Sequence, residues 1–370
     1  MTSVCFVVES GTDARMLEGL ATRVNLTALV REVSGGRAVS QSTRIRVHYR
    51  SSNRVVFASQ VFRWLLTHRY DAVLVQGSGI AALAANAACR LRARPCWMLI
   101  CSPVAEYYEA RRAAGRPCSR AALAGIHAIG WLNARLGRRY VVLSEYLRTV
   151  ISGYASEPMV RVIPVYGVDA TLFAPRPVDR ATLRQSRGLP TTGVIMFNSS
   201  RVAPEKDIHT LIAAFAELVS EGRDVYLLHR SGGHLEFMRL AERAGIAQRV
   251  IATDAVDPRR ELPLDYLACD VCVQASRAEG LGFSVLEAFA CGTPVVATAV
   301  GGLKETVQDG ITGWTAPPGN SAALADALRQ AIDRPDEARR RVAAGAALVR
   351  ARFDSRRAFD ELATLLGQPA

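Results

Sequence analysis

The sequence is almost devoid of lysine: its 370 residues include 44 arginines but only Lys206 and Lys304. It also lacks any apolar run approaching the ~20 residues that a helix needs to cross a bilayer, so no membrane-spanning helix is expected. Met1 to Gly11 has no basic region before its apolar stretch, which argues against a secretory signal. Internal repeats and long low-complexity segments are absent too, which excludes a solenoid and a largely disordered chain.

Cysteine occurs eight times but without a convincing metal or disulfide pattern. Cys269 and Cys272 have the spacing of a metal or redox pair, yet no second pair and no histidine cluster accompanies them. They lie in an apolar strand pattern, so we expect buried packing residues and predict no metal site. Reduced thiols suit a cytoplasmic protein, and peripheral contact with the inner face of a membrane is an additional option.

Length and composition indicate a two-domain α/β protein. A chain of 370 residues exceeds one typical core. A hydrophobic content of 49% and a mean hydropathy of +0.10 suit well-buried layers. Apolar strand patterns alternate with amphipathic helix patterns in both halves, which favours two mostly parallel sheets covered by helices. The expected strands are 4–8, 71–75, 95–100, 139–143, 194–198, 224–229, 249–251, 270–273 and 294–297. The expected helices are 54–68, 78–91, 119–136, 145–152, 207–220, 234–244, 261–267, 283–291 and most of 322–366.

Positive charge is concentrated in the N-terminal half. Residues 1–165 contain 22 arginines, no lysine and nine acidic residues, a net charge of +13, whereas the remainder is close to neutral. Such a field attracts anionic lipid surfaces, diphosphate-linked molecules or nucleic acid. The alternative is an arginine-biased composition with ordinary solvated faces. The arginine clusters lack interleaved aromatic residues, so nucleic acid is not predicted as a partner.

Two carboxylates, Glu279 and Glu287, bracket a glycine-bearing turn that runs into a helical pattern. The unpaired N–H groups and the dipole at a helix N-terminus favour an anion, and carboxylates accept hydrogen bonds from sugar hydroxyls. The pattern therefore indicates a site for a phosphorylated polyol. The alternative is a surface loop whose second glutamate occupies the first turn of a helix.

Arg201 and Lys206 follow the expected strand 194–198 and precede the next expected helix. In open α/β sheets, ligands bind at the carboxyl ends of strands, which places both cations at such an edge. In a chain so poor in lysine, Lys206 is an unusual choice. A compact ammonium suits a single phosphate oxygen.

Together with these positions, the segments 291–296 (CGTPVV) and 309–313 (DGITG) resemble family 4 of the retaining glycosyltransferases. The resemblance is strong in the C-terminal half and also touches 163–169. It implies the GT-B fold, with two Rossmann-like doubly wound domains facing across a cleft and a C-terminal helix that crosses back to the N-terminal domain. The expected boundaries are 1–165 for acceptor binding, 166–354 for the nucleotide sugar and 355–370 for the returning helix.

The resemblance implies a hexosyltransferase that moves a hexose from a nucleotide-diphosphate sugar to a hydroxyl acceptor with retention of configuration. Fixed cations and helix donors would stabilise the departing diphosphate without a metal ion or other cofactor. The expected catalytic residues are Glu279, Arg201 and Lys206. The expected donor-binding residues are Gly280, Leu281, Gly282, Phe283, Glu287, Ser10, Gly11 and Arg230.

The expected acceptor is a saccharide, a lipid-linked saccharide or another amphiphile. The uncharged stretch 121–134 lies beside an arginine cluster and could rest on an anionic membrane, although a buried core helix is the favoured interpretation. One alternative function is a GT-B-fold sugar-nucleotide epimerase, and another is a basic scaffold that binds lipid or nucleic acid. The turn 76–82 fits part of a dinucleotide fingerprint, but the next strand is not followed by the acidic residue that such a site requires.

Overall fold

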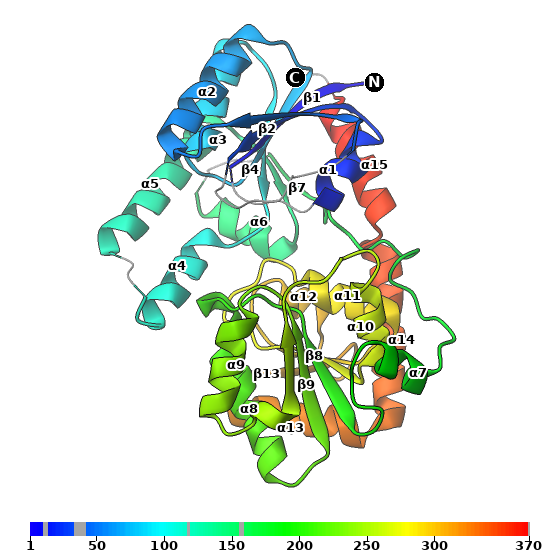
Figure 1. Cartoon of the computed structure of the whole chain (residues 1–370). Helices are drawn as coiled ribbons and strands as arrows, with labels where there is room; N and C mark the ends of the chain where they lie inside the picture. Colours follow the sequence, from blue (N-terminus) through cyan, green and yellow to red (C-terminus); the bar gives the residue numbers. More distant parts are fainter. Residues whose placement is uncertain (10–13, 33–41, 117–118, 155–158, 369–370) are drawn as a thin grey trace. The chain divides into compact units, whose positions relative to one another are not determined.

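The computed structural model describes residues 1–9, 14–32, 42–116, 119–154 and 159–368. It forms two compact units: unit 1 comprises Met1–Tyr108, Pro117–Gly167 and Ser355–Ala370, and unit 2 comprises Glu109–Arg116 and Val168–Asp354. Each unit is built around one parallel sheet (Figure 1). The two sheets are of the Rossmann-like type predicted from the alternating pattern.

The sheet of unit 1 has the order β3-β2-β1-β4-β5-β6-β7, with every described pair parallel. Its strands are β1 (Ser3–Val8), β2 (Asn25–Arg31), β3 (Ile45–Arg50), β4 (Ala72–Gln76), β5 (Cys96–Ile100), β6 (Arg139–Val142) and β7 (Met159–Val162). The helices before the linker are α1 (Ala14–Ala21), α2 (Arg54–Thr67), α3 (Ile80–Leu91), α4 (Val104–Ala113), α5 (Arg120–Leu136) and α6 (Glu145–Ser152). The central strands are continuous apolar runs because helices cover both faces of such a sheet.

The last helix, α15 (Ser355–Leu366), belongs to unit 1 and packs against α1 (Figure 1). Gly19 allows this close approach, since a Cβ there would lie 2.3 Å from Cε2 of Phe359. Arg23 donates from Nε to Oδ1 of Asp360 at 2.5 Å and from Nη2 to the carbonyl of Arg356 at 3.1 Å. The end of the chain is therefore fixed to its first helix.

The sheet of unit 2 has the order β10-β9-β8-β11-β12-β13 and is also parallel. Its strands are β8 (Val194–Asn198), β9 (Val225–Arg230), β10 (Val250–Thr253), β11 (Val271–Gln274), β12 (Val295–Thr298) and β13 (Trp314–Ala316). Its α-helices are α7 (Arg180–Ser186), α8 (Ile208–Ser220), α9 (His234–Arg243), α10 (Leu262–Ala268), α11 (Phe283–Cys291), α12 (Leu303–Thr306), α13 (Ser321–Asp333) and α14 (Pro335–Arg352). The strand order reverses between β8 and β11, so the topological switch point lies there.

Helix α5 differs from the favoured interpretation of its sequence. Only Asn133 and Ala134 are buried in this 17-residue helix, while Trp131 is 45% exposed and Leu132 is 41% exposed. The expectation of a buried core helix over 121–134 is therefore wrong. Its apolar composition resembles that of a core element, but its position on the unit leaves most of it in contact with solvent.

His229, at the end of β9, is fully buried and uncharged. Its Nδ1 lies 3.1 Å from Oδ1 of Asn198, whose amide donates to the carbonyl of Val273, so the hydrogen-bond network assigns the proton to Nδ1. Its ring stacks on Phe237 with centroids 4.0 Å apart. Burial, assisted by the nearby His234, lowers the pKa of His229 to about 4.

This low pKa predicts a loss of stability in mild acid. As the pH falls from about 6.5 to 4, the unfolded chain binds a proton that folded His229 does not. Above about pH 6.5 His229 is neutral in both states, so the unfolding free energy is highest there. About 3 kcal/mol of it is lost by pH 4. Urea unfolding at pH 7 and pH 5 should show a smaller pH difference for His229→Gln than for the unchanged chain. An equal pH difference in the two proteins would contradict this role of His229.

Candidate functional site

The candidate site lies at the switch point of unit 2, where β8 and β11 end. The segment after β8 carries Arg201 and Lys206, and the segment after β11 carries Glu279. Neighbouring parallel strands bring their carboxyl ends to one edge, so residues more than 70 positions apart meet there. Helix α11 starts at this edge and α12 lies beside it (Figure 1).

Lys206 and Glu279 form a partly buried ion pair between Nζ and Oε2. Their side chains are 13% and 11% exposed, so the pair is largely shielded from water while still reaching the surface. The same Oε2 accepts from Nε2 of Gln274 at 2.6 Å, and Oε1 accepts from the N–H of Gly280 at 3.2 Å. These contacts fix the carboxylate at the entrance of the glycine turn.

The turn after Glu279 approaches a second glycine turn, backbone against backbone. Gly282 has a φ of +91° and is the N-cap of α11, whose N-terminus has no side-chain cap. The N–H of Gly302 donates to the carbonyl of Glu279 at 3.0 Å. A Cβ on Gly302 would lie 2.1 Å from the carbonyl oxygen of Gly280, and no side-chain rotation could relieve that clash.

Gly302→Ala is therefore expected to displace the turn 279–283 and to reduce any activity that depends on Glu279 by at least about 10-fold, since small misplacements of a reacting group are costly. A steady-state assay, with circular dichroism to confirm the fold, measures the effect. Gly310→Ala is a control for glycine removal in the same unit, because no atom lies within 4 Å of its Cβ position, although its φ of +75° adds local strain. Equal activity in the two variants would contradict a specific role for the close approach.

Arg201 lies at the same edge but is directed differently from Lys206. Its side chain is 61% exposed and its Nη2 lies 2.5 Å from Oε1 of the buried Glu205. The carbonyl of Glu205 accepts from the N–H of Arg277 at 2.8 Å, which connects the segment after β8 to the segment after β11. Arg201 thus has an exposed guanidinium that is paired with the buried carboxylate of Glu205.

Glu287, one turn into α11, is only 5% exposed. Its Oε2 accepts from the hydroxyl of Tyr266 at 3.0 Å, and that hydroxyl also lies 3.2 Å from Oγ of Ser199. Burial and the negative charge of Glu287 raise the pKa of Tyr266 well above its usual value, so the phenol stays protonated as a donor. Glu287 is therefore held in the interior of unit 2 by its bond to Tyr266.

Arg230 lies in a buried ion network around Asp265. Its Nε is 3.1 Å from Oδ2 of Asp265, its Nη1 donates to Oγ1 of Thr253, and its Nη2 donates to the carbonyl of Arg187. With a side chain only 9% exposed, it is oriented by the protein interior. The predicted ligand residues Ser10 and Gly11 lie outside the described residues.

Three residues of this arrangement were not predicted to serve the site: Gln274, Tyr266 and Gly302. Gln274 is the last residue of a buried strand, and its polarity at that position is a detectable signal because such strands are otherwise apolar. Tyr266 and Gly302 contact segments that are distant in the sequence, so the spacing of residues along the chain does not predict their role. The described cysteines 269 and 272 are buried and free, which confirms their predicted packing role.

Among the described residues, no cluster of three or more His, Cys, Asp or Glu side chains could hold a metal ion. No helix in the described ranges is long and apolar enough to cross a membrane.

The chain is similar to proteins of known function. A family model for glycosyl transferases group 1 matches residues 179–348. The GDP-mannose-dependent alpha-(1-6)-phosphatidylinositol monomannoside mannosyltransferase of Mycolicibacterium smegmatis is 34% identical over 263 residues, which cover 65% of this chain and 68% of that protein. The D-inositol 3-phosphate glycosyltransferase of Xylanimonas cellulosilytica is 38% identical over 201 residues, or 52% of this chain and 48% of the relative. The chain thus spans about half the length of that second relative.

Solved structures give the fold. Anabaena HepE in complex with UDP-glucose matches with a TM-score of 0.81 and 21% identity over 99% of both chains. This likeness confirms the predicted GT-B architecture of two Rossmann-like sheets. From its family model and its mannosyltransferase relative, the chain belongs to the glycosyl transferases of group 1 and is a hexosyltransferase.

Proposed function

We propose that the chain transfers a hexose from a nucleotide-diphosphate sugar to a hydroxyl acceptor, with retention of configuration and without a metal ion. The observation that carries this proposal is the Lys206–Glu279 pair at the switch point, beside the uncapped N-terminus of α11. A cation and a helix N-terminus suit a diphosphate, and a carboxylate suits sugar hydroxyls.

The chemistry follows from where charge develops. As the bond between sugar C1 and the diphosphate breaks, negative charge grows on the β-phosphate and C1 becomes positive. Lys206, the exposed Arg201 and the N-terminus of α11 stabilise the phosphate, supplying the positive charge that a metal ion gives elsewhere. Glu279 positions the sugar and supports the positive C1, and the diphosphate helps to deprotonate the acceptor hydroxyl. Glu287 is assigned to the ribose hydroxyls.

The nucleobase of the donor can be identified by thermal-shift measurements with GDP, UDP and ADP, because ligand binding to the native state stabilises it. The relatives make the first two the leading choices: one is named for GDP-mannose and HepE was solved with UDP-glucose. Nuclear magnetic resonance of the product made from an α-linked donor should then show an α-linkage. A β-linked product would contradict retention, and isomerised nucleotide sugar formed without acceptor would identify an epimerase instead.

For the acceptor we propose a phosphorylated polyol, free or attached to a lipid. The names of the two relatives contain an inositol phosphate in lipid-linked and soluble form. The net charge of +13 over residues 1–165 favours such an anionic acceptor. Parallel assays with inositol 3-phosphate and with phosphatidylinositol in detergent distinguish the two forms, and transfer to neither would exclude this class.

We further propose peripheral contact between helix α5 and an anionic membrane. The helix begins with Arg120 and exposes Trp131 and Leu132, and Arg111, Arg112 and Arg116 precede it in the sequence. An apolar face with adjacent basic residues suits the interface of an anionic bilayer. Sedimentation with phosphatidylglycerol vesicles should show salt-sensitive binding that Trp131→Ser weakens, while Val55→Ser, at a residue 70% exposed on α2, leaves it unchanged. Absence of salt-sensitive binding would exclude membrane contact.

A further inference from the structure

A cavity of about 740 Å³ opens on one edge of the unit 2 sheet. The glycine turn 279–283, called the donor turn below, lies on the opposite edge. It lies where strands begin: Val194 starts β8, Val271 starts β11 and Pro294 precedes β12, and all three line it. Its volume falls within the 300–1,000 Å³ typical of small-molecule sites. The proposed donor chemistry, at the carboxyl ends of the same strands, does not use it.

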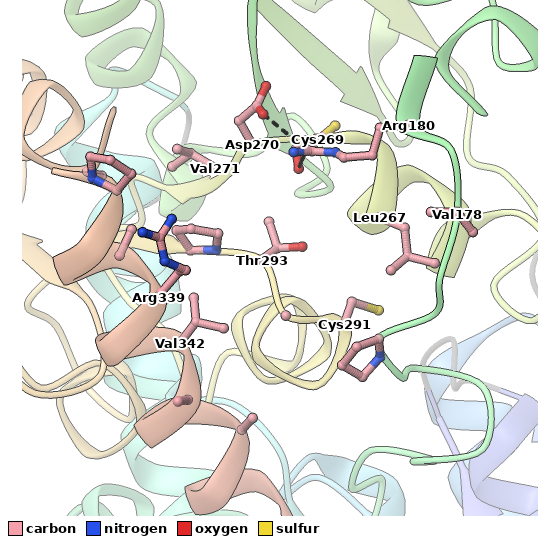
Figure 2. Close-up of a pocket in the computed structure, with 18 of the residues that line it drawn as sticks. Val178, Arg180, Leu267, Cys269, Asp270, Val271, Cys291, Thr293, Arg339 and Val342 are labelled. Carbon is pink, nitrogen blue, oxygen red and sulfur yellow. Dashed lines mark hydrogen bonds and ion pairs between the residues drawn. The ribbon is translucent and has the colours of Figure 1, made fainter. Parts of the chain in front are cut away.

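The walls of this cavity are mainly apolar. Helix α14 contributes one face through Ala338, Val342 and Ala346, whose spacing of four residues aligns side chains along a helix. Figure 2 shows Val342 and Arg339 on one side of the cavity and Leu267 and Val178 on the other. An aliphatic chain placed here would bury apolar surface against these walls.

The charge around the cavity is positive. Four arginines and one carboxylate line it: Arg176, Arg180, Arg339, Arg350 and Asp270. Asp270 is already neutralised, because it lies 3.0 Å from Arg180 and 2.5 Å from Arg184 and accepts from the N–H of Ile195 at 2.7 Å. Arg176 donates to the carbonyl of Leu172 at 3.0 Å rather than to a carboxylate, and Arg350 has no ion-pair partner among the described residues. The cavity therefore favours an anionic head group.

Hydrogen bonds connect the cavity to the donor carboxylates. Thr293, between Asp270 and Cys291 in Figure 2, donates from Oγ1 to the carbonyl of Tyr266 at 2.8 Å. The hydroxyl of Tyr266 in turn bonds Glu287. Strand β11 forms a second connection, since it starts at the cavity with Val271 and ends with Gln274, which bonds Glu279.

We propose that this cavity binds a small amphipathic anion, an aliphatic chain ending in a carboxylate or a phosphate, and that the occupant alters the affinity of the donor turn for its nucleotide. The apolar walls select the chain. Arg180 pairs with Asp270 and Arg339 with Asp336, so the guanidiniums of Arg176 and Arg350 select the head group. This effector site goes beyond the proposed transfer reaction and uses none of its residues. The hydrogen bonds through Tyr266 and the residues of β11 connect the occupant of the cavity to Glu287 and Glu279.

Isothermal titration calorimetry with decanoate and with decyl phosphate, both below micelle-forming concentrations, tests binding and identifies the preferred head group. We expect saturable binding of one molecule per chain by at least one of them, and none by acetate or inorganic phosphate. Ala343→Trp, which places an indole at the cavity wall, should lower the affinity at least 10-fold. Ala347→Trp is the matched control, an exposed alanine on the same helix that does not line the cavity, and should leave it unchanged.

Absence of saturable binding by both probes would overturn the site, as would equal affinities in Ala343→Trp and Ala347→Trp. Sedimentation showing a dimer that only Ala343→Trp dissociates would assign the cavity to a second copy of the chain and would also overturn it. These binding measurements need no sugar donor. Their outcome is therefore independent of whether the transferase proposal fails.

Coupling is measured by titrating the nucleoside diphosphate selected in the thermal-shift screen with and without saturating probe. We expect the dissociation constant of the nucleotide to change at least about 5-fold, the lower end of typical coupling between sites. The same change should be absent in Ala343→Trp. An unchanged constant in the unmodified chain with bound probe would overturn the effector role.

Discussion

Replacing Glu279 by glutamine is expected to reduce the transfer rate at least about 100-fold, the scale of losing one electrostatic contact to the reacting centre. Glutamine keeps the size of the side chain but removes the charge that pairs with Lys206. The glutamine can still accept from the N–H of Gly280, so the turn should keep its shape. Lys206→Ala should cause a comparable loss because it removes the cation that we propose for the diphosphate.

Kinetics separate these two roles. Loss of Lys206 should weaken binding of the nucleoside diphosphate as well as transfer, whereas Glu279→Gln should lower kcat with little change in nucleotide affinity. Glu221→Gln is a suitable control, since Glu221 pairs with Arg329 and Arg223 in a surface network away from this edge. Transfer within about 3-fold of the unchanged chain in both site variants would contradict the assignment.

Replacing Asp265 by alanine is expected to lower the free energy of unfolding by about 3–5 kcal/mol, the cost of leaving buried charge unpaired. The Asp265 side chain is 0% exposed and accepts from Nε of Arg187 at 3.0 Å. Arg230 approaches its other oxygen at 3.1 Å. Burial raises the pKa of Asp265 while the two arginines oppose that rise, so their attraction keeps the carboxylate inside.

Asp224→Ala is the matched control for this stability measurement. Asp224 also pairs with an arginine, Arg249 at 2.7 Å, but the two side chains are 56% and 37% exposed. Exposed pairs contribute roughly 0–1 kcal/mol, so urea unfolding should separate the two variants clearly. A loss below about 1 kcal/mol for Asp265→Ala would show that the buried network is not needed for stability.

The sequence predicted strands β1, β4 to β6 and β8 to β12 and missed β2, β3, β7 and β13. Helix 283–291 and strand 194–198 were predicted with the bounds found in the structure. Strand β13 has only three residues, and β7 has four with no fully buried position, so neither offers a pattern long enough to recognise. Helix α5 was misjudged because composition reports how apolar a helix is and does not report what covers it.

At the candidate site, residue types were easier to predict than their contacts. Glu279 and Lys206 were both singled out from local patterns, but 73 positions separate them and only the sheet topology brings them together. The supporting role of Gly302 depends on its distance from the Gly280 carbonyl, which no local signal reveals. Arg230, expected to lie near the nucleotide, pairs with Asp265, and this contact too depends on a segment distant in the sequence.

The position of α15 has a consequence for how the chain folds during synthesis. The surface of α1 at Gly19, against which Phe359 packs, stays uncovered until α15 has been synthesised, long after α1 itself. Domains usually fold in the order in which they are synthesised, yet unit 1, which begins before unit 2, is completed after it. Truncated translation products should therefore expose apolar surface on the early half of the protein and depend on chaperones there.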